Sequence, residues 1–233
     1  MTSLALKARL QRASAGRCEV PDCGRSRRNF SSLCRHHDQV RDRTGHPLGT
    51  TVRKRDVKPY LKLTSRWLKE HRNHPAIEAG CRWLDALVYG NRPHVTSVNP
   101  RSSPEDRLLR WLDRMKEEEV DPVSVLATIA AMFMLRECEP RTFRHDRHFH
   151  HQVTIRVLRL TRGPRREWWA CGRQGFSYDR VTTGVREHLW NTLRPPIGAL
   201  CLRIARAVTA AYTPPPPPPS TLLDGIRTPF PNE

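Results

Sequence analysis

The sequence predicts a mainly α-helical protein with a small cysteine- and histidine-bearing module at its N-terminus and a disordered, proline-rich C-terminal tail. Three observations carry this prediction. Helix-start signals recur along the middle of the chain, ligand-type residues cluster near its beginning, and six consecutive prolines stand near its end. We divide the 233 residues into a basic N-terminal helix plus the module (1–50), a basic arm (51–58), a helical domain (59–212) and a polyproline and flexible tail (213–233).

The first segment carries an unusual share of the positive charge. The whole chain has 41 Lys+Arg against 23 Asp+Glu, a formal net charge of +18, and residues 1–60 alone hold a net +9 of it. Such an asymmetry is typical of a nucleic-acid-binding end. Arginine supplies 35 of the 41 basic residues. Bidentate phosphate and guanine contacts explain this preference, and so does the codon bias of a GC-rich genome, so the ratio alone does not discriminate between them.

Hydropathy and cysteine usage argue against several other classes of protein. No stretch reaches the roughly 18 uncharged apolar residues that a bilayer span needs, and the longest, 123–135, is too short. A membrane protein, a secreted precursor and an acidic disordered protein are therefore disfavoured. Four of the seven cysteines are widely scattered, which fits a reducing compartment better than a disulfide framework. We expect a location in the bacterial cytoplasm.

Three cysteines and a histidine near the N-terminus have the spacing of zinc ligands. Cys18, Cys23 and Cys34 are followed by His36 and His37, which gives the string C-x4-C-x10-C-x2-H. Helix positions three apart share a face and positions two apart diverge, so His37 joins Cys34 at the metal. The predicted ligands of a structural Zn²⁺ are therefore Cys18, Cys23, Cys34 and His37, a closed set of four. The alternatives are free thiols in a reducing cytosol or a disulfide with one thiol left over.

The surrounding residues support a turn followed by a helix. Pro21, Asp22 and Gly24 favour a turn around Cys23, and a helix over residues 33–43 is expected to stop at Gly45. Before the turn, residues 3–15 predict a short basic amphipathic helix that packs on the module or lies against a phosphate backbone.

The motif resembles a short treble-clef-like zinc module of phage and bacterial mobile-element proteins, sometimes found beside HNH-type nuclease domains. The resemblance rests on C-E-V-P-D-C-G-R, then L-C-R-H-H-D-Q-V-R, then T-G-H-P, and covers residues 16–49 alone. It implies a DNA-associated setting with the same four metal ligands. No His-Asn-His constellation follows in the sequence, so the nuclease half of the resemblance lacks support.

Basic residues surround the ligands and continue past them. Each basic residue alone is most simply a solvated charge. Together, on a module that zinc holds in shape, they predict a surface that contacts the phosphate backbone of a nucleic acid. They lie in the loop between the ligand pairs, on the ligand helix and in the basic arm. The predicted nucleic-acid-binding residues are Arg25, Arg27, Arg28, Arg35, Arg41, Arg43, Arg53, Lys54, Arg55 and Lys58.

Prolines and cap residues mark the helices of the body. Pro59, Pro75, Ser103-Pro104 and Asp121-Pro122 each open a predicted helix, and the last of these helices is apolar nearly all round, as a central buried helix would be.

Residues 149–160 fit a helix and a strand about equally well. Residues 161–178 are interpreted as a loop that the Trp168-Trp169 pair anchors to the core. The alternative is that the tryptophans and the neighbouring basic residues stack unpaired bases or hold a phosphate. Helices over residues 179–193 and 196–212 then close the body.

A second cluster of histidines precedes residue 152. His145, His148 and His151 recur at intervals of three, so a helix would align them loosely as a second metal site or as an acid/base cluster. The neighbouring Arg144 and Arg147 raise the cost of bringing in a cation. The alternative is a positively biased face near a helix start at residue 146.

The function predicted from these features is non-enzymatic, zinc-stabilised binding of nucleic acid, with DNA as the expected partner, by a protein of a bacterial mobile element or phage. One alternative is a metal-dependent nuclease or recombination enzyme whose acid/base residues are the histidines of 145–151. Another is a protein-interaction scaffold that engages an operon partner through the module and the C-terminal tail. No membrane partner is expected.

Overall fold

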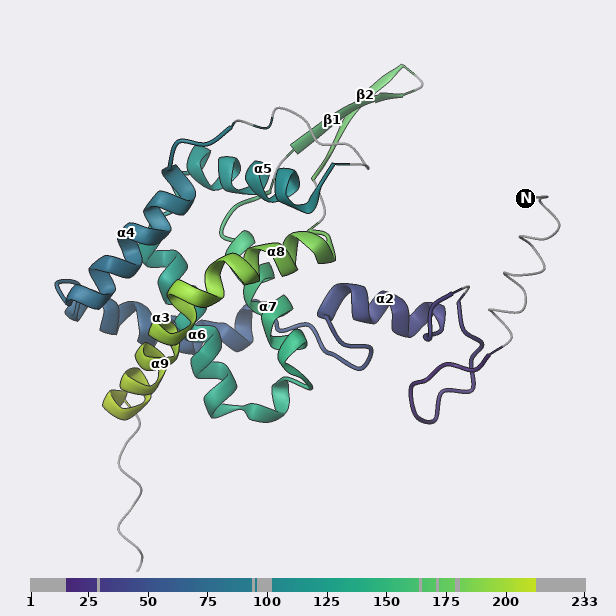
Figure 1. Cartoon of the computed structure of the whole chain (residues 1–233), viewed down its shortest axis with the longest axis horizontal. Helices are drawn as coiled ribbons and strands as arrows, with labels where there is room; N and C mark the ends of the chain where they lie inside the picture. The colour runs from purple at the N-terminus through teal and green to yellow at the C-terminus, as the bar shows by residue number, and fades with distance from the viewer. Residues whose placement is uncertain are drawn as a thin grey trace, which may run out of the picture.

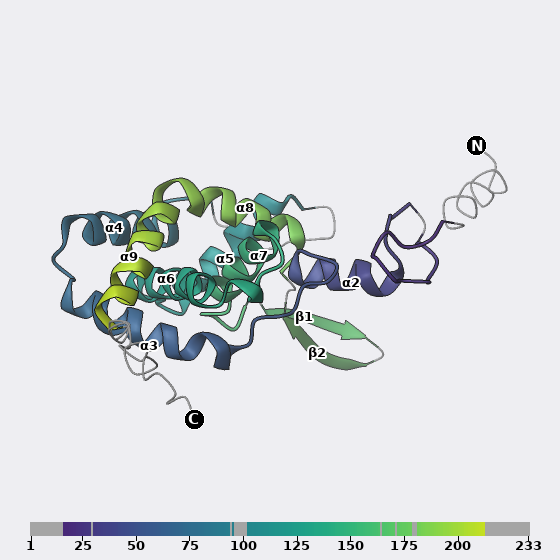
Figure 2. The same cartoon turned by 90° about the horizontal axis from the view of Figure 1, so that it is seen from below.

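A helical body and a smaller N-terminal module make up the structure, a computed structural model that describes residues 16–28, 30–93, 95, 102–163, 165–170, 172–178 and 181–212. The module extends from one end of the body (Figures 1 and 2). The predicted helix over 3–15 and the predicted tail over 213–233 lie outside the described residues. All helices of the described ranges are too short or too polar to serve as membrane spans.

Helices dominate the described chain, as the sequence predicts. The module contributes α2 (Arg35–Thr44). The helices of the body are α3 (Lys54–Glu70), α4 (Pro75–Tyr89), α5 (Pro104–Glu117), α6 (Pro122–Cys138), α7 (Asp146–Leu158), α8 (Thr183–Leu193) and α9 (Ala199–Tyr212). A 3₁₀ turn, η1 (Pro140–Thr142), precedes α7, and a π-helical turn, η2 (Arg194–Gly198), joins α8 to α9.

Three helices of the body begin at the predicted proline signals. Pro75, Pro104 and Pro122 occupy the first helical position, where the missing backbone N–H costs nothing. The hydroxyl of Ser103 accepts a 3.0 Å hydrogen bond from the Asp106 backbone N–H, which satisfies one of the unpaired donors of the first turn of α5.

The core forms around α6, which packs against α3, α4, α7 and α9 (Figure 1). Ten of its seventeen residues are buried, among them Leu126 and Leu135 with no exposed surface, so the prediction of a central buried helix is confirmed. Burying such side chains is the main favourable contribution to folding, at about 25 cal/mol per Å² of apolar surface. The module has a separate apolar cluster that, among the described residues, consists of Val20, Leu33 and the three cysteines.

The start of α3 differs from the prediction. The helix begins at Lys54, and Pro59 lies in its interior. The carboxylate of Asp56 accepts a 2.8 Å hydrogen bond from the Arg53 backbone N–H, which supports this earlier start. The interior proline removes one backbone donor, but burial of the opposite face of the helix against α6 outweighs that loss. Residues 54–58 are therefore the first part of a helix rather than an arm.

Residues 165–178 form a β-hairpin that the sequence analysis treats as a loop. Strands β1 (Arg165–Ala170) and β2 (Arg173–Tyr178) are antiparallel, with Ala170 paired to Arg173 across a two-residue connection. Gly172 in this connection has a φ of +70°, a value that glycine adopts at little cost. The side chains of the tryptophan pair in β1 lie outside the described part of the structure. Residues 149–160, for which helix and strand were both open, are helical up to Leu158, because α7 spans Asp146–Leu158.

Candidate metal centre and cationic surface

A tight turn presents the first two predicted ligands. The Cys23 backbone N–H donates to the Val20 carbonyl at 3.1 Å, and the Cys18 N–H donates to the Arg25 carbonyl at 3.0 Å. Asp22 stands between them with a φ of +61°, in the left-handed region that Asp and Asn tolerate better than most residues. The chain therefore reverses within a few residues and brings two thiols to the same side.

The start of α2 presents the other two ligands. Cys34 is the N-cap residue of α2 and His37 lies in its first turn, so both side chains project from the beginning of one helix. Cys34 also donates its backbone N–H to the Cys18 sulfur at 3.3 Å. One ligand pair therefore comes from a turn and the other from the start of a helix.

The four ligand atoms converge at distances that fit tetrahedral zinc. His37 Nδ1 lies 3.4 Å from Cys18 Sγ and 3.5 Å from Cys34 Sγ, and the Cys23 and Cys34 sulfurs are 3.9 Å apart. All four atoms lie within 4.8 Å of one another. With Zn–S bonds of about 2.3 Å and Zn–N bonds of about 2.0 Å, a tetrahedron has edges of about 3.5–3.8 Å. The residues therefore suit a zinc ion, and His36, which the spacing excludes, is exposed.

The local electrostatics favour a thiolate at Cys34. The backbone amide of His37 lowers the pKa of the Cys34 thiol, although burial acts in the opposite direction. At Cys23 the Arg25 backbone amide also acts to lower the pKa, but burial and the neighbouring thiols raise it on balance. Metal binding requires deprotonated thiols, and a Zn²⁺ ion held by three of them supplies the compensating charge.

Acidic neighbours divide the predicted cations of the module into two groups. Arg41 and Arg28 both pair with Asp38, at 2.5 and 3.7 Å, and Arg27 pairs with Glu19 at 3.4 Å. These three guanidinium groups are partly exposed and also form ion pairs within the module. Among the predicted cations of the module, Arg25, Arg35 and Arg43 are exposed and have no ion pair within the described residues, and the same holds for Arg17, which was not predicted.

The remaining predicted cations stand at the start of α3. Arg53, Lys54, Arg55 and Lys58 are all exposed, and among them Arg55 alone pairs with a described acidic residue, Asp56 at 3.5 Å. The predicted basic run ends at Lys58, directly before the helix start predicted at Pro59. Lys62, Arg66 and Lys69 continue the run, and the intervals of four and three residues from Lys58 onward were the signal that would have revealed them.

Residues 45–52 connect the module to α3 and are anchored along α7. His148 Nε2 donates to the Thr50 carbonyl at 2.7 Å, and the Val52 N–H donates to the Gln152 side-chain oxygen at 3.0 Å. Arg156 also donates to the Val52 carbonyl. These contacts fix the position of the module relative to the body, since the backbone polar groups of the connection have partners inside the fold.

His145, His148 and His151, the second predicted cluster, do not come together as a group of metal ligands within the described residues. His145 accepts a 3.1 Å hydrogen bond from the Arg147 N–H as the cap of α7, and His148 binds the connection. His151 is buried and accepts from Arg186 at 3.3 Å. The three rings therefore serve separate structural contacts, and within the described ranges the Cys3His group is the one set of three or more ligand-type residues that could hold a metal.

Comparison of this chain with protein-family models, with curated proteins and with solved structures finds no match.

Proposed function

We propose that this protein is a zinc-stabilised, non-enzymatic nucleic-acid-binding protein, and that its partner is DNA. The observation that carries the proposal is the combination of a closed Cys3His donor set with exposed cations on the same small module. The resemblance of residues 16–49 to a module of mobile-element proteins supports a bacterial mobile-element or phage origin and a cytoplasmic setting.

A structural role for the metal follows from the donor set. Four protein ligands fill the coordination sphere of zinc and leave no position for a water that could attack a substrate. The module has a very small apolar cluster, so it depends on the metal for its fold. Zinc binding in small modules contributes on the order of 10–16 kcal/mol at neutral pH, enough to organise such a segment. The metal would thereby hold Arg25, Arg35 and Arg43 in fixed positions.

The charge supports a polyanionic partner. Contacts from arginine and lysine to phosphates supply most of the affinity of non-specific nucleic-acid binding and give it a steep salt dependence. One or two of the unpaired arginines would be available to reach base edges, while the others follow the backbone.

A titration of fluorescent duplex DNA at 50–200 mM salt tests the proposal. We expect the affinity to fall steeply with salt, and the triple variant Arg25→Gln, Arg35→Gln, Arg43→Gln to bind on the order of 10-fold or more weakly. A matched triple variant, Arg82→Gln, Arg194→Gln, Arg203→Gln, removes the same charge from exposed positions of the body. Binding that stays flat with salt, or equal losses in the two variants, would contradict the proposal. Cleavage of plasmid DNA in the presence of Mg²⁺ or Mn²⁺ would instead favour a nuclease.

A further inference from the structure

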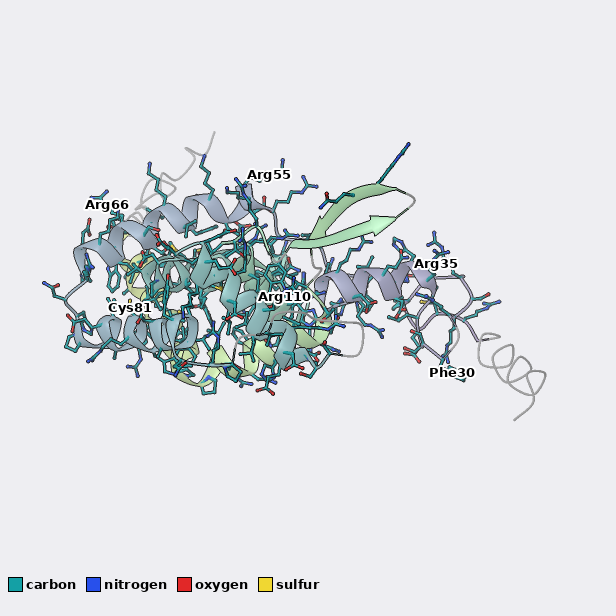
Figure 3. All side chains as sticks on the ribbon, turned by 90° about the horizontal axis from the view of Figure 1, so that it is seen from above. Phe30, Arg35, Arg55, Arg66, Cys81 and Arg110 are labelled. Atoms are coloured by element: carbon teal, nitrogen blue, oxygen red, sulfur yellow. The ribbon has the colours of Figure 1, made fainter. Side chains whose placement is uncertain are left out.

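The outer face of α3 carries a continuous stripe of positive charge. At about 100° per residue, six basic residues of this helix fall within one sector of about 120°. All six are exposed, and Ser65 is the only other residue in the sector. We call this set the α3 stripe; its members are Lys54, Arg55, Lys58, Lys62, Arg66 and Lys69. Figure 3 shows the labelled Arg55 and Arg66 on the outer side of α3, pointing away from the body.

The acidic residues of α3 lie outside the stripe. Asp56 and Glu70 fall beyond its edge on the helical projection, where they pair with Arg55 at 3.5 Å and Arg66 at 2.9 Å. The four lysines form no ion pair with any described residue. Exposed pairs such as those of Arg55 and Arg66 contribute about 0–1 kcal/mol, so a stronger anionic partner can displace them.

The opposite face of α3 explains why the stripe is fixed in place. Val57, Thr64 and Leu68 are buried, and the Thr64 hydroxyl lies 3.2 Å from the Ala127 carbonyl of α6, to which it donates. The helix is therefore a rigid part of the body. Its N-terminal end points toward α2, so the stripe begins where the module and its connection end (Figure 2).

The lysine content of α3 is not the product of uniform composition. The chain has six lysines in 233 residues, and four of them stand on this one helix of 17 residues. A genome-wide preference for arginine codons would act on α3 as on the rest of the chain. The concentration of lysines therefore sets α3 apart from the rest of the chain, and lysine binds phosphate as a compact point charge.

We infer that the α3 stripe binds the phosphate backbone of double-stranded DNA, as a second contact surface beside the module. This inference rests on the proposed function and names the surface that would provide most of its affinity. From Lys54 to Lys69 the stripe is about 22 Å long at 1.5 Å per residue. One DNA strand places a phosphate every 3.4 Å along the axis, so this length faces about six phosphates. The stripe has no aromatic residue on which an unpaired base would stack, which favours a duplex over a single strand.

The test compares two triple variants of the full-length zinc-loaded protein on one 20-base-pair duplex. Lys58→Gln, Lys62→Gln, Lys69→Gln removes three charges from the stripe, and Arg82→Gln, Arg194→Gln, Arg203→Gln removes three from exposed positions outside α3. Each lost phosphate contact should reduce the slope of log K against log salt by about 0.9, so the stripe variant should lose about 2.7 in slope and on the order of 100-fold in affinity at 0.1 M salt. The control variant should stay close to the wild type in both.

The possible outcomes distinguish a failure of the inference about the α3 stripe from a failure of the proposed function. If the wild type binds the duplex and the two variants bind equally well, the stripe is not a contact surface and the proposed function stands. A preference for single-stranded DNA that the stripe variant retains overturns the inference in the same way. If the wild type does not bind duplex DNA at 50 mM salt, both the inference and the proposed function fail. Zinc content and the helical circular dichroism signal, measured for each variant, establish that all three proteins are folded.

Discussion

The guanidinium of Arg186, in α8, donates a 2.6 Å hydrogen bond to the backbone carbonyl of Asp42, in α2. A second nitrogen of the same group donates to the Arg43 carbonyl at 3.1 Å. The last carbonyls of a helix have no partner within it and carry the negative end of the helix dipole. A buried cation 144 positions along the chain therefore caps the C-terminus of α2 and attaches the module to the body.

Replacing Arg186 should loosen this attachment without removing the metal site. We expect Arg186→Gln to lower the free energy of unfolding by about 3 kcal/mol, because several buried carbonyls lose a charged donor. Amide exchange in residues 35–44 should accelerate, while zinc content stays unchanged. Arg194→Gln, at an exposed position a few residues later, is the matched control and should unfold like the wild type in urea. Equal stability of the two variants would show that the cap contributes nothing.

Gly45, the C-cap residue of α2, stands where a side chain has no room. Its φ is +88°, and a Cβ there would lie 2.7 Å from the Arg147 carbonyl and 2.7 Å from the His151 ring. Gly45→Ala should therefore cost about 2–4 kcal/mol through backbone strain and steric overlap. Gly24→Ala is the control, since a Cβ at that position meets nothing within 4 Å. Thermal unfolding of both variants tests this, and a Gly45→Ala midpoint equal to that of Gly24→Ala would contradict the geometry.

Metal removal should unfold the module and leave the body intact. The body has a large apolar core of its own, whereas the module cluster contains two residues besides its cysteines. We expect one zinc ion per chain, and after chelation or in Cys34→Ser we expect amides of residues 16–44 to lose protection while those of α6 keep theirs. Cys138→Ser, at an exposed cysteine outside the cluster, should retain the metal. Unchanged protection of the module without metal would show that zinc is not what holds it.

The features that could be predicted from the sequence are those whose determining interactions are local. The ligand set could be predicted because Cys34 and His37 share one helix turn, and α4, α5 and α6 could be predicted because their caps lie within a few residues of their starts. Helix caps and metal ligands at short spacing are encoded in adjacent residues, so a single sequence is enough to recognise them.

The errors concern contacts between distant parts of the chain. The ring of His148 is bound to Thr50, 98 positions away, and no spacing rule distinguishes such a histidine from a metal ligand. The start of α3 was misplaced because the proline rule assumes the first turn, whereas packing against α6 sustains the helix through Pro59. The two-residue connection at Gly172, between segments rich in aromatic residues, was the local signal for the hairpin that the analysis missed.

Acid should destabilise the body through His151. Burial lowers the pKa of His151 to about 4, and the charges of Arg186 and Arg147 act in the same direction, opposed by Glu187. Burial likewise lowers the pKa of the neighbouring His150 to about 4. An unfolded histidine titrates near 6.5, so between pH 6.5 and 4 the unfolded state binds more protons, and the stability present above pH 6.5 is lost as the pH falls. Each ring should contribute a loss of up to about 1.4 kcal/mol per pH unit in this window.

Urea unfolding followed by tryptophan fluorescence measures this loss, because all six tryptophans lie outside residues 16–44 and report on the body. His151→Gln keeps an acceptor for Arg186 and cannot be protonated, so its stability should fall less steeply below pH 6.5 than that of the wild type. His188→Gln, at a half-buried position of α8, should follow the wild-type curve. If the free energy of unfolding falls with pH in parallel for the wild type and His151→Gln, His151 is not a source of the acid sensitivity. A zinc-free control over the same pH range separates this effect from protonation of the metal ligands.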